Sequence, residues 1–153
     1  MRNDVLTVYV DADSCPVKEE IGHLCKKYNK KLVFVASYAH EINPSLGAEL
    51  VTVDSRAEEA DLYIVNHCRR GDVVVTQDHG LAGLLLPKGV NVISPRGKIF
   101  LEEDMNELLF TRHLGKIQRR AGMKTKGPKK IKNEDILMFY EEFEKILSKL
   151  EGV

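Results

Sequence analysis

Short apolar runs recur along the chain, and the segments between them carry apolar residues at every third or fourth position. A continuous apolar run of about four to eight residues is typical of a strand covered on both faces. The spacing of three and four is typical of an amphipathic helix. The alternation of the two patterns predicts parallel strands joined by right-handed crossovers. The predicted strands are residues 5–10, 32–36, 49–53, 73–76 and 90–93.

The expected fold class is α/β. We expect a three-layer sandwich in which a mostly parallel sheet of about five strands carries helices on both faces, followed by a C-terminal helical extension. Ser14 is a candidate N-cap for the first helix, with Pro16 in its first turn, and residues 55–58 have the form of a capping box. The predicted helices are residues 17–28, 57–68, 79–86, 102–114 and 133–150.

Positive charge is concentrated late in a chain whose net charge is zero. From Arg112 to Lys132 there is no acidic residue, and glycines interrupt the segment. This composition is typical of a nucleic-acid-binding arm, and equally of a solvated linker. We therefore divide the chain into an α/β domain (1–117), a basic flexible segment (118–132) and a C-terminal amphipathic helix (133–153). The stretch from Arg112 to Lys132 contains nine basic residues, namely Arg112, Lys116, Arg119, Arg120, Lys124, Lys126, Lys129, Lys130 and Lys132.

The last predicted helix carries an apolar stripe. A stripe of this kind either packs on the domain or contacts a partner helix, so a homo-oligomer formed through this helix is one of two alternatives. Asn133 is its predicted cap. The stripe consists of Ile136, Tyr140, Phe143, Leu147 and Leu150.

Several classes of protein are not indicated. The first thirty residues do not resemble a signal peptide, and no apolar run is long enough to span a bilayer. We therefore expect a soluble, cytoplasmic protein without a membrane partner. Cys15, Cys25 and Cys68 are widely spaced, so neither a disulfide framework nor a zinc site is expected.

Acidic residues follow two of the predicted strands. Asp11 and Asp13 come directly after the first strand, and Asp78 follows the fourth and precedes a helix. If the chain stays extended, Asp11 and Asp13 point to the same side. Asp61 lies at the edge of the apolar face of the second helix, where it either reaches solvent in the first turns or points toward the same edge as Asp11. Ligands of open α/β sheets bind at this carboxyl edge.

Converging carboxylates repel one another unless a cation or protons intervene. Carboxylate ligands without neighbouring His or Cys pairs favour Mg²⁺ or Mn²⁺, which activate water for phosphoryl chemistry. We therefore expect Asp11, Asp13, Asp61 and Asp78 to be the metal-binding and catalytic residues. In the simpler alternative, Asp13 and Asp78 only cap helices.

At these residues the chain resembles the PIN-like nuclease superfamily, whose first strand ends in Asp and whose fourth carries a Thr-x-Asp motif, here Thr76-Gln77-Asp78. It resembles more closely the bacterial YaiI/YqxD family of PIN-like proteins, whose biochemical role is uncharacterised. The resemblance implies a PIN-like fold and a metal-dependent ribonuclease-type site with Asp11, Asp61 and Asp78 in the acid positions. His79-Gly80 departs from the pattern, because many PIN nucleases carry another acid there, and Asp13 is the candidate replacement. The matching motifs are residues 10–16, Ala60-Asp61, residues 71–78, Pro95-Arg96-Gly97 and Gly127-Pro128.

The expected partner is nucleic acid, in particular RNA, and the candidate substrate-binding residues fall into two groups. Near the acids, Arg96 follows the fifth strand and either clamps a scissile phosphate or forms a salt bridge with Asp11 or Asp78. Within the basic segment, the lysines are expected to contact phosphates. The complete set is Ser14, Thr76, Arg96, Lys124, Lys126, Lys129 and Lys130.

Two other functions fit parts of the sequence. Asp11-x-Asp13 after an apolar strand also resembles haloacid-dehalogenase-type phosphatases, in which the first Asp is a nucleophile and the second an acid/base. Cys15 and Pro16, and the lack of an obvious later pair of acids, depart from that pattern. The basic segment alone would suit a non-catalytic RNA-binding module. A metal-dependent nuclease remains the main hypothesis, and the two others are its alternatives.

Overall fold

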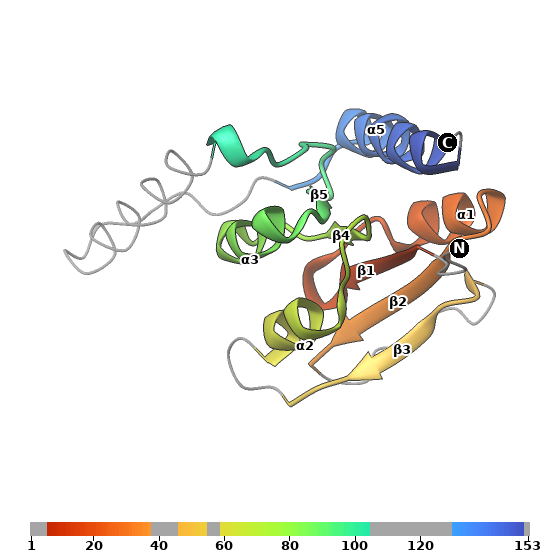
Figure 1. Cartoon of the computed structure of the whole chain (residues 1–153). Coiled ribbons are helices and arrows are strands. Elements are labelled where there is room, and N and C mark those ends of the chain that lie inside the picture. The colour runs from red at the N-terminus through yellow and green to blue at the C-terminus, as the bar shows by residue number, and fades with distance from the viewer. Residues whose placement is uncertain (1–5, 38–45, 55–58, 105–129, 152–153) are drawn as a thin grey trace, which may run out of the picture.

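The computed structural model describes residues 6–37, 46–54, 59–104 and 130–151. It contains a parallel sheet in the order β3-β2-β1-β4-β5 (Figure 1). The apolar runs form the strands as predicted, with ends that differ by one or two residues. The strands are β1 (Thr7–Asp11), β2 (Lys31–Ala36), β3 (Glu49–Thr52), β4 (Val73–Val75) and β5 (Asn91–Ile93).

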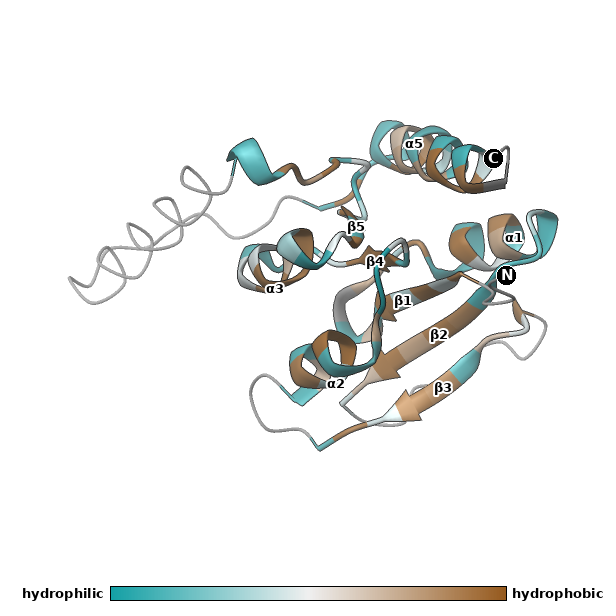
Figure 2. Ribbon diagram, in the orientation of Figure 1, coloured by the Kyte–Doolittle hydropathy of each residue, from teal (hydrophilic) through white to brown (hydrophobic). Residues whose placement is uncertain are grey.

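Helices cover both faces of this sheet, which confirms the three-layer α/β class. Along β1, Val8 and Val10 face the side covered by α1 (Lys18–Lys27) and α5 (Asn133–Glu151). Tyr9 faces the side covered by α2 (Glu59–His67) and α3 (His79–Leu85). Because successive strand residues point to opposite faces, the continuous apolar runs supply both cores. The apolar residues of the strands lie between the helical layers in Figure 2.

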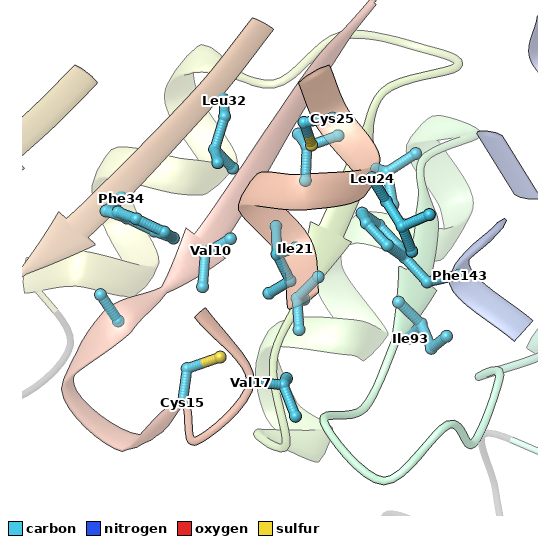
Figure 3. Packing of buried hydrophobic residues seen from close by; sticks show 14 of the residues in the cluster. Val10, Cys15, Val17, Ile21, Leu24, Cys25, Leu32, Phe34, Ile93 and Phe143 are labelled. Carbon is cyan, nitrogen blue, oxygen red and sulfur yellow. The ribbon is translucent and has the colours of Figure 1, made fainter. Parts of the chain in front are cut away.

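The C-terminal helix completes the first of these cores. Phe143 is fully buried, as are Ile21 and Leu24 of α1 (Figure 3). At the surface of the same contact, Lys27 of α1 forms an ion pair with Glu144 of α5 at 2.6 Å. Burying one such large apolar side chain contributes about 1.5–3 kcal/mol. The apolar stripe of α5 therefore packs on the domain, and oligomerisation through this helix stays a prediction.

The beginning of α1 differs from the prediction. The chain after β1 makes one turn of 3₁₀ helix, η1 (Ala12–Ser14), and α1 begins only at Lys18, after Val17 in the N-cap position without a side-chain cap. Ser14 is therefore not the N-cap of α1, and Pro16 precedes the helix. The chain leaves the extended conformation at Ala12, so the condition under which strand alternation would place Asp11 and Asp13 on the same side is not met.

Other local predictions fared differently. The helix predicted for residues 79–86 is present as α3, which ends at Leu85. Pro87 then lies in a 3₁₀ turn, η3 (Leu86–Lys88), and Gly89 ends this turn in the left-handed conformation. Of the helix predicted for residues 102–114, the described part is η4 (Glu102–Asp104). The capping box at residues 55–58 lies outside the described residues. Asn133 is the first residue of α5 rather than its N-cap, so that prediction is wrong by one position. The side chain of Asp135 accepts the Lys132 amide N–H at 2.9 Å.

Candidate active site

The centre of the carboxyl edge lies between β1 and β4. In the strand order, β2 lies next to β1 on the side away from β4, and β5 lies next to β4 on the side away from β1. The chain runs from β1 to β2 through α1, and from β4 to β5 through α3. The two helices lie on opposite faces. Open α/β sheets bind ligands at the point where neighbouring connections leave the sheet in opposite directions, as they do here. Asp11 is the last residue of β1, and Thr76 directly follows β4, so both lie at this position.

A hydrogen-bonded group of three residues lies at this point of the carboxyl edge. The Thr76 hydroxyl donates to Asp11 Oδ2 at 3.2 Å, and its Oγ1 accepts the Asp78 amide N–H at 3.1 Å. Only 1% of Thr76 is exposed. The hydroxyl therefore acts as donor and acceptor within the protein and fixes the two acids relative to each other. This geometry makes Thr76 a positioning residue for the acids; substrate contact by its hydroxyl remains untested.

The environment of Asp11 opposes its negative charge. Burial is the largest effect and raises the pKa of the Asp11 carboxyl above its usual value, whereas the Thr76 hydrogen bond lowers that pKa. The nearby carboxylates of Asp13 and Asp78 raise it further. Within the part of the chain that the structure describes, both charged groups that act on Asp11 are thus negative. A cation at this position would reduce the repulsion among the three acids.

Asp13 is held in a different way from the one predicted. Its two carboxylate oxygens accept the amide N–H of Ser37 at 3.0 and 3.1 Å, just beyond the end of β2. The side chain is exposed, and it links η1 to the carboxyl end of β2. Ser14 lies in the same turn. The Ser37 contact has no signal in the sequence, because it depends on the pairing of β2 with β1.

Asp78 has a structural role as well. Its Oδ1 accepts the Leu81 amide N–H at 3.1 Å, so the side chain caps α3. The cap that the sequence suggested as the simpler alternative is therefore present. It does not exclude a second role, because a carboxylate has several acceptor positions on its two oxygens.

The four predicted metal ligands are not gathered into one cage. Asp61 is half-buried on α2, and the charged groups that act on the Asp11 pKa are Asp13 and Asp78. Over the described ranges, no three His, Cys, Asp or Glu side chains are arranged so that they could hold a metal ion. Mg²⁺ is nevertheless commonly held by one or two carboxylates, with waters and substrate phosphate in the other positions. The donors of Asp11 and Asp78 fit that type of site.

Arg96 lies at the same edge but pairs with another acid. Its guanidinium forms an ion pair with Asp135 of α5 at 2.8 Å, so the predicted salt bridge to Asp11 or Asp78 had the wrong partner. Asp135 stands in the first turn of α5, where a carboxylate is favoured, and that position was the available signal for it. The remaining candidates lie in the basic segment. Lys130 is exposed, and Lys124, Lys126 and Lys129 lie outside the described residues.

Comparison with known proteins identifies the family. The family model described as "Uncharacterized BCR, YaiI/YqxD family" matches residues 9–149. A UPF0178 protein of Shouchella clausii is 52% identical over 144 residues, which cover 94% of each chain. One from Halalkalibacterium halodurans is 48% identical over 157 residues, covering 100% of both. One from Listeria monocytogenes is 40% identical over 132 residues, covering 86% of this chain and 89% of its own.

No solved structure matches the chain. Within the described residues, no helix has both the length and the apolar character needed to cross a membrane. The match of the family model begins within β1 and ends within α5, and it therefore includes every acid of the candidate site. The chain belongs to the YaiI/YqxD family of uncharacterised bacterial proteins.

Proposed function

We propose that this protein is a divalent-metal-dependent nuclease that hydrolyses phosphodiester bonds, with RNA as the expected substrate. The observation that carries the proposal is the position and charge of Asp11. It is a partly buried carboxylate at the carboxyl end of β1, beside β4, and the charged groups that act on it among the described residues are two further carboxylates. Such an arrangement favours the binding of a cation and, through the cation, of a phosphate group.

The protein residues have separate tasks in this proposal. Asp11 and Asp78 would hold Mg²⁺ or Mn²⁺, and Thr76 fixes the orientation of Asp11 through its hydroxyl. A bound cation would neutralise phosphate charge and would lower the pKa of a water molecule at the site. Asp13 and Asp61 remain candidate ligands, with Asp13 close enough to raise the pKa of Asp11. A hydrogen bond between Asp78 and the backbone of α3 keeps the second acid in place.

The geometry supports a nuclease better than a phosphatase of the haloacid-dehalogenase type. That mechanism requires the second acid of the Asp-x-Asp motif to face the reacting phosphate beside the first. Here the chain turns after Asp11, and both oxygens of Asp13 accept the Ser37 amide N–H. A non-catalytic RNA-binding module remains the second alternative, because the basic segment could bind phosphates without the acids.

A cleavage assay tests the proposal. A fluorescein-labelled single-stranded RNA of mixed sequence is incubated with the wild-type protein, Asp11→Asn and Glu102→Gln, each with Mn²⁺ or with EDTA. Glu102 is an exposed acid on η4 and serves as the matched control. We expect cleavage by the wild type and Glu102→Gln only with the metal, and none by Asp11→Asn.

The other outcomes identify the alternatives. Equal cleavage by Asp11→Asn and the wild type would contradict the proposed site. RNA binding without any cleavage would favour the non-catalytic module. Hydrolysis of p-nitrophenyl phosphate, with RNA left intact, would favour the phosphatase.

A further inference from the structure

The end of the basic segment is fixed to the loop that follows β5. Gly97 lies so close to α5 that a Cβ atom built there would be 2.9 Å from both the Met138 carbonyl carbon and the Phe139 nitrogen. In the same loop, Arg96 pairs with Asp135, whose carboxylate also accepts the Lys132 amide N–H at 2.9 Å. Asp135 therefore links the last residue before α5 to the carboxyl edge of the sheet.

Two lysines at this end face the solvent. Ile131 packs against the core cluster beneath α1 and α5, whereas Lys130 and Lys132 on either side of it are exposed. The packing of Ile131 and the hydrogen bond at Lys132 hold both lysines at the β5 side of the edge. The backbone at these lysines is thus held near Asp135, the partner of the half-buried Arg96 guanidinium, and their side chains are exposed.

The carboxyl edge is consequently divided by charge. Its centre at β1 and β4 carries Asp11 and Asp78, and its β5 end carries Arg96, Lys130 and Lys132 together with one acid, Asp135, which is paired with Arg96. Since neighbouring strands lie about 4.8 Å apart, β5 is about 10 Å from β1. A polyanion repelled by the acids would contact the edge from the cationic end.

We propose that Arg96, Lys130 and Lys132 form a phosphate-binding surface that holds single-stranded nucleic acid beside the acids, with Asp135 occupying Arg96 until a phosphate replaces it. This inference rests on the proposed function, whose substrate it positions. The Arg96–Asp135 pair suits such an exchange, because the two side chains are 33% and 30% exposed and water screens their attraction. A phosphate also accepts two parallel hydrogen bonds from a guanidinium, as a carboxylate does.

Binding is measured by fluorescence anisotropy with a labelled fifteen-nucleotide oligouridylate in EDTA over a range of salt concentrations. The starting protein is Asp11→Asn, so no cleavage can occur and the result does not depend on metal or activity. Lys130→Ala and Lys132→Ala are compared with Lys149→Ala, which changes an exposed lysine about 25 Å away along α5. Each of the first two should reduce the slope of log affinity against log salt by about 0.7, and the control should leave it unchanged.

The exchange at Arg96 is tested by a double-mutant cycle. Asp135→Asn keeps an acceptor for the Lys132 amide N–H but removes the charge that holds Arg96. Asp135→Asn should strengthen binding of the oligouridylate. The same substitution made in an Arg96→Gln background should bring no gain, because the gain comes from the freed guanidinium of Arg96. Equal salt slopes for all three lysine variants would overturn the proposed phosphate-binding surface. A gain from Asp135→Asn that persists in Arg96→Gln would overturn the exchange. Failure of RNA cleavage with intact binding would instead count against the proposed catalysis alone.

Discussion

Replacement of Thr76 by Val should destabilise the protein in a way that depends on pH. Valine has nearly the same shape as threonine, so the change removes the hydroxyl and little else. The hydroxyl donates to a carboxylate at 3.2 Å and accepts a backbone N–H at 3.1 Å, and 1% of the residue is exposed. A hydrogen bond to a charged group contributes about 1.5–3 kcal/mol and a neutral one about 1 kcal/mol. Because Asp11 and Asp78 are only partly buried, water can replace part of the lost hydrogen bonding. We expect the free energy of unfolding to fall by about 2–3 kcal/mol at pH 7.

The pH dependence identifies the cause. The Thr76 hydrogen bond lowers the pKa of Asp11, so it stabilises the charged carboxylate. Its contribution is present above the folded-state pKa of Asp11, which burial raises, and is lost as the pH falls through that value. The stability difference between wild type and Thr76→Val should therefore be largest at pH 7 and smaller near pH 4.

Urea denaturation at several pH values measures this difference, and Thr76→Ser is the matched control. Serine keeps the hydroxyl and removes one methyl group, so it should lose about 1 kcal/mol or less. If Thr76→Ser were as unstable as Thr76→Val, packing rather than hydrogen bonding would explain the result. A loss that is the same at pH 4 and pH 7 would refute the proposed link to the Asp11 charge.

Two further predictions concern backbone contacts near the site, namely the Asp78 cap of α3 and the close approach of Gly97 to α5. Asp78→Ala should lower the free energy of unfolding by about 0.5–2 kcal/mol, because the Leu81 amide N–H loses its acceptor. Asp78→Asn should keep most of this helix cap. Equal destabilisation of the two variants in thermal melts would contradict the prediction. Gly97→Ala should lose about 2–4 kcal/mol, because its φ is +91° and the new Cβ would meet the backbone of α5. Gly47→Ala is the control, because Gly47 has φ +69° but its nearest neighbour is a flexible lysine side chain at 3.4 Å. It should lower the free energy of unfolding by only about 1–2 kcal/mol. Comparable destabilisation of the two variants in urea denaturation would contradict the role of the α5 contact.

The elements of the fold could be predicted from the sequence, because their signals are local. Continuous apolar runs indicate buried parallel strands, and the positions of all five follow from them. The order of the strands has no local signal. It is the order β3-β2-β1-β4-β5 that brings Thr76 next to Asp11, at 65 residues' separation.

The site was predicted in part for the same reason. Acids at strand ends were visible in the sequence, but their orientation depends on contacts between distant segments. The 3₁₀ turn at Ala12 and the amide of Ser37 determine where Asp13 points, and neither has a clear sequence signal. Likewise, Arg96 could be placed at the edge from its position after β5, but its partner Asp135 comes from a helix that only tertiary packing brings there.

The central claim is that Asp11 and Asp78 bind a divalent cation, and the thermal stability of Asp11→Asn with and without Mn²⁺ tests it most directly. Because burial and two neighbouring carboxylates raise the folded-state pKa of Asp11, its charge opposes folding at any pH above that value, and the penalty fades as the pH falls toward the unfolded-state value. Without metal at pH 7, Asp11→Asn should therefore be as stable as the wild type or more stable. Saturating Mn²⁺ should raise the melting temperature of the wild type and leave that of Asp11→Asn unchanged. A metal-free Asp11→Asn protein that is less stable than the wild type, yet shows the full Mn²⁺ shift, would contradict the claim.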